Sequence, residues 1–213
     1  ATELTGDHAT VSEPDADRYG RAIACIDATN AKDPNRELVD GVPTPKELAY
    51  SRRMTAMLER FAPGAPESVR LAVRCQHIRR WETPRASYPA TPEGYQAWRA
   101  GLLKFHAEAA AGILRDAGYD AETVARVMKL LRKQGIKRDP DVQLLEDIAA
   151  LVFFEHYAAD FARTHPDYDE AKLTDILVKT LKKMSSDGRT AAGSLLRPPE
   201  AVARLLRKAV DVA

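Results

Sequence analysis

The chain has 213 residues, of which 45% are hydrophobic and 30% are charged. Its 32 basic and 31 acidic residues leave a formal net charge of +1, which argues against a general nucleic-acid-binding protein. No run is apolar enough to predict a transmembrane helix, and the two cysteines, Cys25 and Cys75, do not form a disulfide framework. We expect a cytoplasmic protein without a membrane partner, with a flexible lead-in at residues 1–14 and one domain at residues 15–213.

Hydrophobic periodicity predicts helices along most of the chain. Their ends are marked by proline, by glycines such as Gly118 and Gly135, and by the N-cap candidate Asp139. The predicted helices cover residues 15–32, 45–61, 67–81, 92–117, 121–134, 140–165, 169–184 and 198–210. No window alternates apolar and polar residues, so no strand is expected. The predicted fold is an all-α, single-domain bundle of about seven or eight helices.

The predicted helix 140–165 is the most informative one. Its segment LLEDIAALVFFEHY (Leu144–Tyr157) is apolar on nearly all sides, which is typical of a helix at the centre of a bundle. The same segment carries Glu146 and Asp147, and helical spacing puts Asp147 on an apolar face. A buried carboxylate needs an ion pair, hydrogen bonds or a metal ion.

Two histidines lie within apolar stripes of other helices. His77 continues the stripe of Val69 and Val73, and His106 lies in the middle of the stripe of helix 92–117. If the helices pack together, His77, His106 and Asp147 would bind a divalent metal such as iron, manganese or zinc. The alternative is that each histidine is a core residue with one hydrogen bond, and that the acidic residues pair with buried arginines.

Basic residues beside His77 suggest a ligand. Arg74 and Arg80 flank His77 at a spacing of three residues, and together with Arg53 they would hold a phosphate group. Glu146 would act as a general base if it does not bind the metal. The expected partner is a small anionic or phosphorylated ligand. The alternative for these arginines is a solvent-exposed helix face.

Several segments resemble a known family. They are DATNAKDPN, AYSRRM, RCQHIRRW, PRASYP, GYQAWR, KFHAEAA, IKRDPDVQLLEDIAALVFFEHY and ILVKTLKKMS. In this order they resemble the family named domain of unknown function 4202, over about residues 18–189. That family has no established activity, so the resemblance implies no substrate.

A more distant similarity concerns the His-Asp domain phosphohydrolases, which are all-helical. They bind metal through a histidine, a His-Asp pair on a later helix and a further aspartate, and the order His77, His106, Asp147 is similar. Ala107 follows His106 where that superfamily has its paired aspartate. The similarity therefore implies either an incomplete metal site or a substitute carboxylate such as Glu146.

Three functions follow as hypotheses. The first is a metal-dependent hydrolase for a small phosphorylated metabolite or nucleotide, in which a metal-bound water attacks the substrate. The second is a non-catalytic helical module that binds an anionic ligand or a protein partner. The third is an iron-dependent oxygenase that uses the same residues.

Overall fold

The computed structural model describes residues 13–212 and confirms an all-α domain. The described chain forms ten α-helices, rather than seven or eight. They are α1 (Glu13–Asn30), α2 (Lys46–Phe61), α3 (Glu67–Cys75), α4 (Pro92–Asp116), α5 (Ala121–Leu131), α6 (Pro140–Val152), α7 (Ala158–Thr164), α8 (Glu170–Leu181), α9 (Ser186–Ser194) and α10 (Glu200–Val210). None of them is long and apolar enough to cross a membrane. Of the lead-in predicted at residues 1–14, residues 1–12 lie outside the described part of the chain, and α1 already begins at Glu13.

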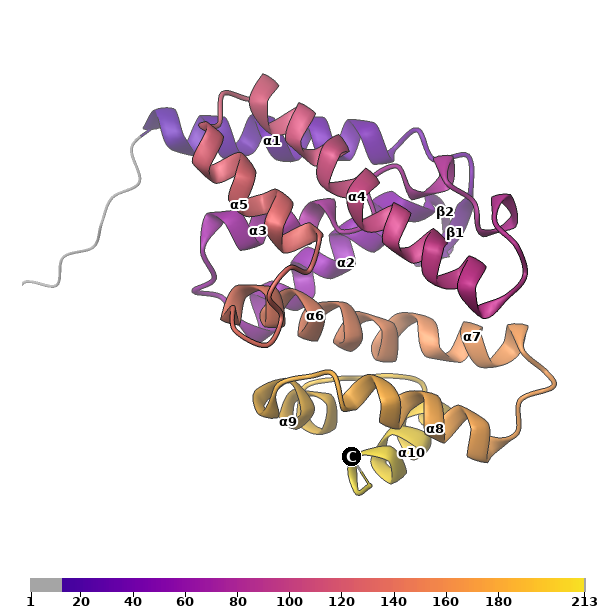
Figure 1. Ribbon diagram of the computed structural model, residues 1–213. Helices are drawn as coiled ribbons and strands as arrows, with labels where there is room; N and C mark the ends of the chain where they lie inside the picture. Colours follow the sequence, from indigo (N-terminus) through magenta and orange to yellow (C-terminus); the bar gives the residue numbers. More distant parts are fainter. Residues whose placement is uncertain (1–12, 213) are drawn as a thin grey trace, which may run out of the picture.

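The helices form three tiers, which Figure 1 shows from the side. Helices α1 to α5 make the upper tier, α6 and α7 run across the middle, and α8 to α10 lie below. Helix α6 packs against α2, α3 and α5 on one side and against α9 on the other. Its residues Leu145, Ile148, Leu151 and Val152 are fully buried, so the prediction that this segment lies at the centre of the bundle is confirmed.

Most helix ends follow the expected chemistry. Asp139 accepts a hydrogen bond from the backbone N–H of Asp141 and caps α6, as predicted. Gly118 follows the C-cap of α4 with a φ angle of 91°, a left-handed conformation that glycine adopts without strain where a helix ends. The prediction that Gly135 closes the next helix was wrong, because α5 ends at Leu131 and Lys133 takes the left-handed conformation after its C-cap, with a φ of 53°.

A β-hairpin is the first departure from the prediction. Strands β1 (Arg36–Val39) and β2 (Val42–Pro45) pair antiparallel, with Val39 opposite Val42. The two turn residues, Asp40 and Gly41, have φ angles of 50° and 80°, as a two-residue type I′ turn requires. Four-residue strands are too short to show alternation, and the Asp-Gly pair was the only signal for them.

Two predicted helices are interrupted. The predicted helix 67–81 ends at Cys75, and Arg79 then adopts a φ of 56° before a short 3-10 turn at Arg80–Glu82. Arg80 therefore does not continue the helical stripe of His77. The predicted helix 140–165 contains a π-helical turn at Phe153–Tyr157 between α6 and α7. Such turns are frequent at functional sites.

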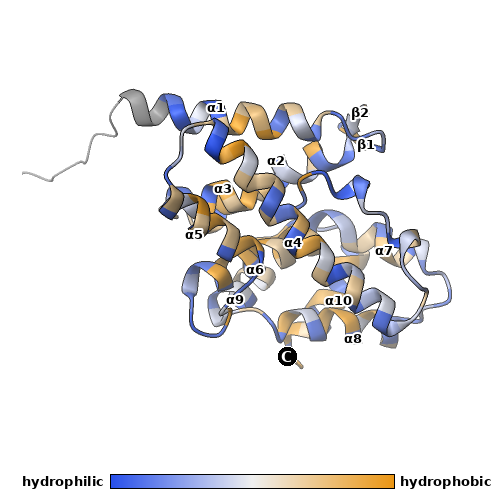
Figure 2. Ribbon diagram, turned by 45° about the horizontal axis from the view of Figure 1, so that its top comes forward, coloured by the Kyte–Doolittle hydropathy of each residue, from blue (hydrophilic) through white to orange (hydrophobic). Residues whose placement is uncertain are grey.

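Helix α9 was not predicted from the sequence. Its sequence SDGRTAAGS contains two glycines and little periodicity, but Ser185 caps it by accepting a hydrogen bond from the N–H of Gly188. Figure 2 shows that the hydrophobic residues of the helices face the interior of the bundle, while the exposed faces are largely hydrophilic.

Candidate functional site

The structure brings the two predicted histidines together. The ring centroids of His77 and His106 lie 5.9 Å apart. On its other side, the His77 ring stacks on Tyr50 from α2, with centroids 4.0 Å apart and an interplanar angle of 10°. Tyr50 in turn contacts Tyr157 from the π-helical turn. A continuous row of four rings therefore runs from α4 to the π-helical turn.

His106 is a neutral, buried ring. Its Nδ1 lies 2.8 Å from the carbonyl oxygen of Ile78, which only accepts, so Nδ1 carries the proton. Burial and the neighbouring His77 lower the pKa of His106 to about 3. Its Nε2 is buried and has no hydrogen-bond partner among the described residues. His106 therefore matches the predicted alternative of a core histidine with one hydrogen bond.

A buried carboxyl faces His77. Glu47 lies in the first turn of α2, is 5% exposed, and has an oxygen 3.5 Å from Nδ1 of His77. Burial raises the pKa of Glu47 to about 7, and the nearby Asp33 adds to this, while Arg80 opposes it. Burial and the cations Arg80 and Lys133 lower the pKa of His77. At neutral pH the pair therefore holds a neutral ring beside a carboxyl that is poised to exchange a proton.

Glu47 lies at the wall of a cleft of about 510 Å³ that opens between the start of α2 and the segment after α3. Four cationic side chains line this cleft: Arg36, Lys46, Arg80 and Arg85. The other lining residues are Asn35, Glu47, Trp81, Thr83, Pro84 and Trp98. Four positive charges around one carboxyl give a concave site with a positive potential, which attracts anions.

Arg80 is the cation nearest to the buried carboxyl. Its guanidinium lies over the ring of Trp98, 5.2 Å from the centroid, and its Nη1 is 3.9 Å from an oxygen of Glu47. The Nε–H group of Arg80 is buried and has no hydrogen-bond partner among the described residues. Its side chain is one-third exposed, so the guanidinium is held by the fold but remains accessible.

The predicted general base Glu146 pairs with Lys133 instead of standing free. Burial raises the pKa of Glu146, but the charges of Lys133, Lys183 and Arg99 outweigh it, so the net shift is downward. The charges of Lys133 and Arg99 also lower the pKa of His77, so these groups lie within electrostatic reach of the ring row. Glu146 is thus an ionised carboxylate near the site, and Glu47 is the better proton acceptor at neutral pH.

Asp147 does not join the histidines. One of its oxygens accepts hydrogen bonds from the Gln143 amide and the Ser185 backbone N–H, each 2.9 Å long. Its other oxygen accepts the Ser185 hydroxyl at 2.5 Å. A Cβ atom on Gly188 would lie 2.7 Å from the Asp147 carboxyl carbon, so α9 packs directly on this side chain. Both oxygens of Asp147 are therefore engaged in holding the start of α9.

The described residues contain no group of three or more His, Cys, Asp or Glu side chains placed to hold a metal ion. The predicted set His77, His106 and Asp147 is divided between the ring row and the α9 cap, and Ala107 supplies no ligand. The residues therefore do not fit the iron, manganese or zinc site that the sequence suggested.

Arg74 also has a structural role. Its Nε and Nη2 donate to the two oxygens of Asp27 at 2.8 and 2.7 Å, and its Nη1 donates to the Thr55 hydroxyl. Arg74 is 8% exposed, so it ties α1, α2 and α3 together and does not reach a ligand.

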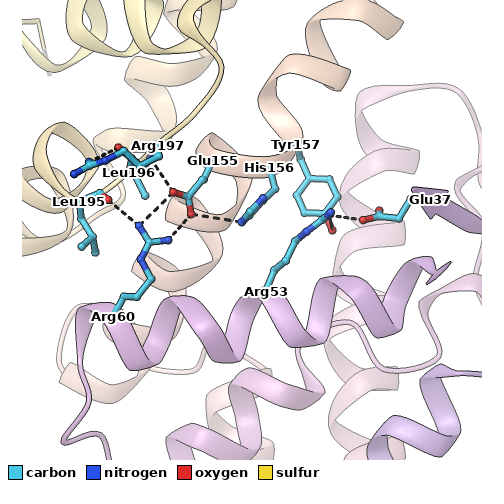
Figure 3. Close-up of polar contacts among 9 residues, drawn as sticks. All are labelled: Glu37, Arg53, Arg60, Glu155, His156, Tyr157, Leu195, Leu196 and Arg197. Carbon is cyan, nitrogen blue, oxygen red and sulfur yellow. Dashed lines mark hydrogen bonds and ion pairs between the residues drawn. The ribbon is translucent and has the colours of Figure 1, made fainter. Parts of the chain in front are cut away.

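A second polar network lies beside the ring row, where the π-helical turn faces α2 (Figure 3). Tyr157 accepts a hydrogen bond from Arg53 at 2.8 Å, and Arg53 also pairs with Glu37 of the hairpin. Arg53, predicted as a phosphate contact, thus anchors the hairpin to the π-helical turn.

The other half of this network joins the middle tier to the lower one. Glu155 accepts from Nη1 of Arg60 at 2.7 Å and from the backbone N–H of Arg197 at 2.8 Å, and Figure 3 shows it between them. Arg60 also donates to the carbonyl of Leu195 at 2.7 Å. The network therefore holds the segment between α9 and α10 against α2.

The fold and the cleft define an all-α protein in which a cleft lined by four cationic side chains lies beside a buried Glu-His pair. A family model matches residues 20–206, and the chain belongs to this family, which is described as Domain of unknown function (DUF4202). Comparison with the curated proteins finds no significant match, and comparison with the solved structures finds none either. The similarity to His-Asp domain phosphohydrolases stays a prediction.

Five residues of the site were not predicted from the sequence: Glu47, Tyr50 and the cationic residues Arg36, Lys46 and Arg85. Glu47 gave one signal, since it begins the buried stripe of α2 that continues through Tyr50 and Met54. The cleft itself gave no signal, because it combines residues from the hairpin, α2, the segment after α3 and α4.

Proposed function

We propose that this protein binds a small anionic metabolite, with a phosphate or carboxylate group, in the cleft beside Arg80. The observation that carries the proposal is the set of four cations, Arg36, Lys46, Arg80 and Arg85, around one concave site. The side chains of Arg36 and Lys46 have no ion-pair or hydrogen-bond partner within residues 13–212, so their charges remain available to a ligand.

Arg80 is the expected anchor of the anion. A guanidinium presents paired N–H donors that match a phosphate or carboxylate, and packing on Trp98 reduces the entropy lost when the ligand binds. The positive charge is local, because the whole chain carries only +1, so a small ligand fits better than a nucleic acid. A cytoplasmic location, consistent with the two free cysteines, is part of this proposal.

The test is titration calorimetry of the full chain with inorganic phosphate, pyrophosphate and adenosine monophosphate. Replacing Arg80 with glutamine should weaken the tightest-bound anion about 10- to 100-fold, since a hydrogen bond to a charged group contributes roughly 1.5–3 kcal/mol. Arg163→Gln is the matched control, because Arg163 is exposed and, within residues 13–212, pairs only with Asp160. Equal affinities for the two variants, or no binding to the wild type, would refute the proposal.

A second candidate function is hydrolysis of a phosphorylated metabolite, and the pKa of Glu47, about 7, favours it. In this reaction ionised Glu47 accepts a proton from a water molecule as the water oxygen attacks phosphorus. The cleft cations stabilise the charge on the phosphoryl oxygens while the bond to the leaving oxygen breaks. His77, 3.5 Å away, positions the Glu47 carboxyl. Metal-dependent hydrolysis and iron-dependent oxygenation lack a matching set of ligands among the described residues.

Release of inorganic phosphate from bound phosphomonoesters tests this second function. The rate should rise with pH to a plateau above about pH 7, because only ionised Glu47 accepts the proton. Glu47→Gln should lower the rate of hydrolysis at least about 100-fold, while the anion still binds. A rate that Glu47→Gln leaves unchanged would leave the protein as a binding module.

A further inference from the structure

A second cavity lies far from the cleft in sequence, in the lower tier. It opens between α7, α8 and α10, and α8 and α10 pack against each other along its side. Eleven of its lining residues are apolar, among them Phe153, Phe161, Leu173 and Leu205, and only Glu170 and Arg204 are charged. In Figure 2 hydrophobic residues recur along both α8 and α10.

The volume of this cavity is about 290 Å³. Protein interiors contain few voids larger than a water molecule, and an apolar cavity of about 150 Å³ is already large enough to bind benzene. A hollow of this size with an apolar lining does not hold water well, because water needs polar partners. The expected occupant is therefore an apolar group that is longer than a single aromatic ring and longer than a short alkyl chain.

The charges at the mouth of the cavity favour an anionic end on that group. Glu170 accepts a hydrogen bond from Arg204 at 2.9 Å and also pairs with Lys208, so one carboxylate serves two cations. Arg204 is more than half exposed and can turn one edge of its guanidinium to a ligand. Arg204 lies close to the start of α8, because it donates to Glu170, the first residue of that helix. The positive end of the α8 dipole adds to the attraction for an anion.

We propose that this cavity binds one medium-chain carboxylic acid, with its alkyl chain among Phe153, Phe161 and Leu205 and its carboxylate at Arg204. The apolar lining buries the chain, and each further buried methylene should tighten binding about fourfold. The net positive charge of the Arg204, Lys208 and Glu170 group selects the carboxylate over a neutral end. This site is separate from the cleft beside Arg80, because the two share no lining residue.

Calorimetric titration of the full chain with decanoate, below its micelle concentration, tests the proposal. We expect saturable binding of one decanoate per chain, and about tenfold weaker binding of decanol, which lacks the charge. Arg204→Gln should weaken decanoate about tenfold. Arg207→Gln, on the same helix but paired with Glu200 outside the cavity, should leave the affinity unchanged.

Filling the cavity is the second arm of the test. Ala162 lines the hollow, and Ala162→Leu should abolish decanoate binding while the circular dichroism spectrum stays that of a folded helical protein. No saturable binding to the wild type, equal affinity for decanol and decanoate, or wild-type affinity in Arg204→Gln or Ala162→Leu would each overturn the proposal. Arg80→Gln, which tests the other cleft, should bind decanoate as the wild type does.

Discussion

Replacing Asp147 with alanine should lower the free energy of unfolding by about 3 kcal/mol. The change removes the acceptor of three hydrogen bonds and leaves the Ser185 N–H and hydroxyl without their partner at a site where Asp147 is 2% exposed. An unsatisfied buried polar group costs about 1–3 kcal/mol, and the loss of the anchor at the start of α9 adds to this. Urea denaturation monitored by circular dichroism measures the difference.

Asp187→Ala is the control for this experiment. Asp187 lies in the first turn of α9 but is exposed, so its removal should change the free energy of unfolding by less than about 0.5 kcal/mol. Asp147→Asn keeps the shape and one acceptor oxygen, so its effect should lie between those of the other two variants. Equal stability of Asp147→Ala and Asp187→Ala would contradict the structural role of Asp147. Loss of a stoichiometric metal from Asp147→Ala, with stability unchanged, would instead restore the metal-ligand role that the sequence suggested.

Replacing Glu47 with glutamine should stabilise the protein above pH 7, by up to about 3 kcal/mol. Burial raises the pKa of Glu47 from 4.5 to about 7, so the folded state binds a proton that the unfolded state has released. Between these two values stability falls as pH rises, because the folded state holds more protons than the unfolded state. Since one pKa unit corresponds to about 1.4 kcal/mol, the full penalty is present above pH 7 and absent below pH 4.5. Glutamine does not ionise, so the Glu47→Gln variant does not lose this stability as the pH rises.

His77 and His106 affect the pH dependence of stability in the opposite direction to Glu47. The pKa of His106 is lowered to about 3 and that of His77 also lies below 6.5, so the folded state holds fewer protons and stability falls as pH drops below about 6.5. In the wild type the Glu47 effect therefore partly cancels theirs. In Glu47→Gln this cancellation is lost, and stability should rise more steeply from pH 5 to pH 7.

Urea denaturation at pH 5 and pH 8 checks this expectation. The stability gap between Glu47→Gln and the wild type should widen as pH rises. Glu59→Gln is the control, because Glu59 is half exposed on the same helix and should give the same difference at both pH values. A Glu47→Gln gap that stays constant between pH 5 and pH 8 would show that Glu47 is ionised in the folded protein across this range.

The helices were predictable because their signals are local. Periodic apolar residues placed α2, α4, α5 and α8 within a few residues of their ends, and Asp139 and Gly118 marked boundaries that the structure confirms. The π-helical turn gave no signal, because its residues are as apolar and helical in pattern as the turns around it. After Cys75 the helix breaks and Arg79 adopts a left-handed conformation, and no residue type in that segment predicts this break.

The site was predictable only in part, because periodicity shows which residues face the interior but not which of them meet. His77 and His106 lay on apolar stripes and came together. Asp147 also faced inward, but toward the lower tier, where it contacts α9, the helix of that tier that was not predicted. Arg74 pairs with Asp27, which lies 47 residues away in the sequence, and this pairing has no sequence signature.

The π-helical turn at Phe153–Tyr157 also sets the relation between the two cavities. A π turn accommodates one more residue than an α turn, so it shifts the angular phase of all that follows by about 100°. Phe161 lines the lower cavity after this turn, and the α6 residues pack on the tier of the basic cleft before it. Deletion of one residue between Phe154 and Tyr157 would rotate α7 relative to α6 without removing a side chain that lines either cavity. The number of residues in the π-helical turn thus determines how the elements that line the two cavities are oriented relative to each other.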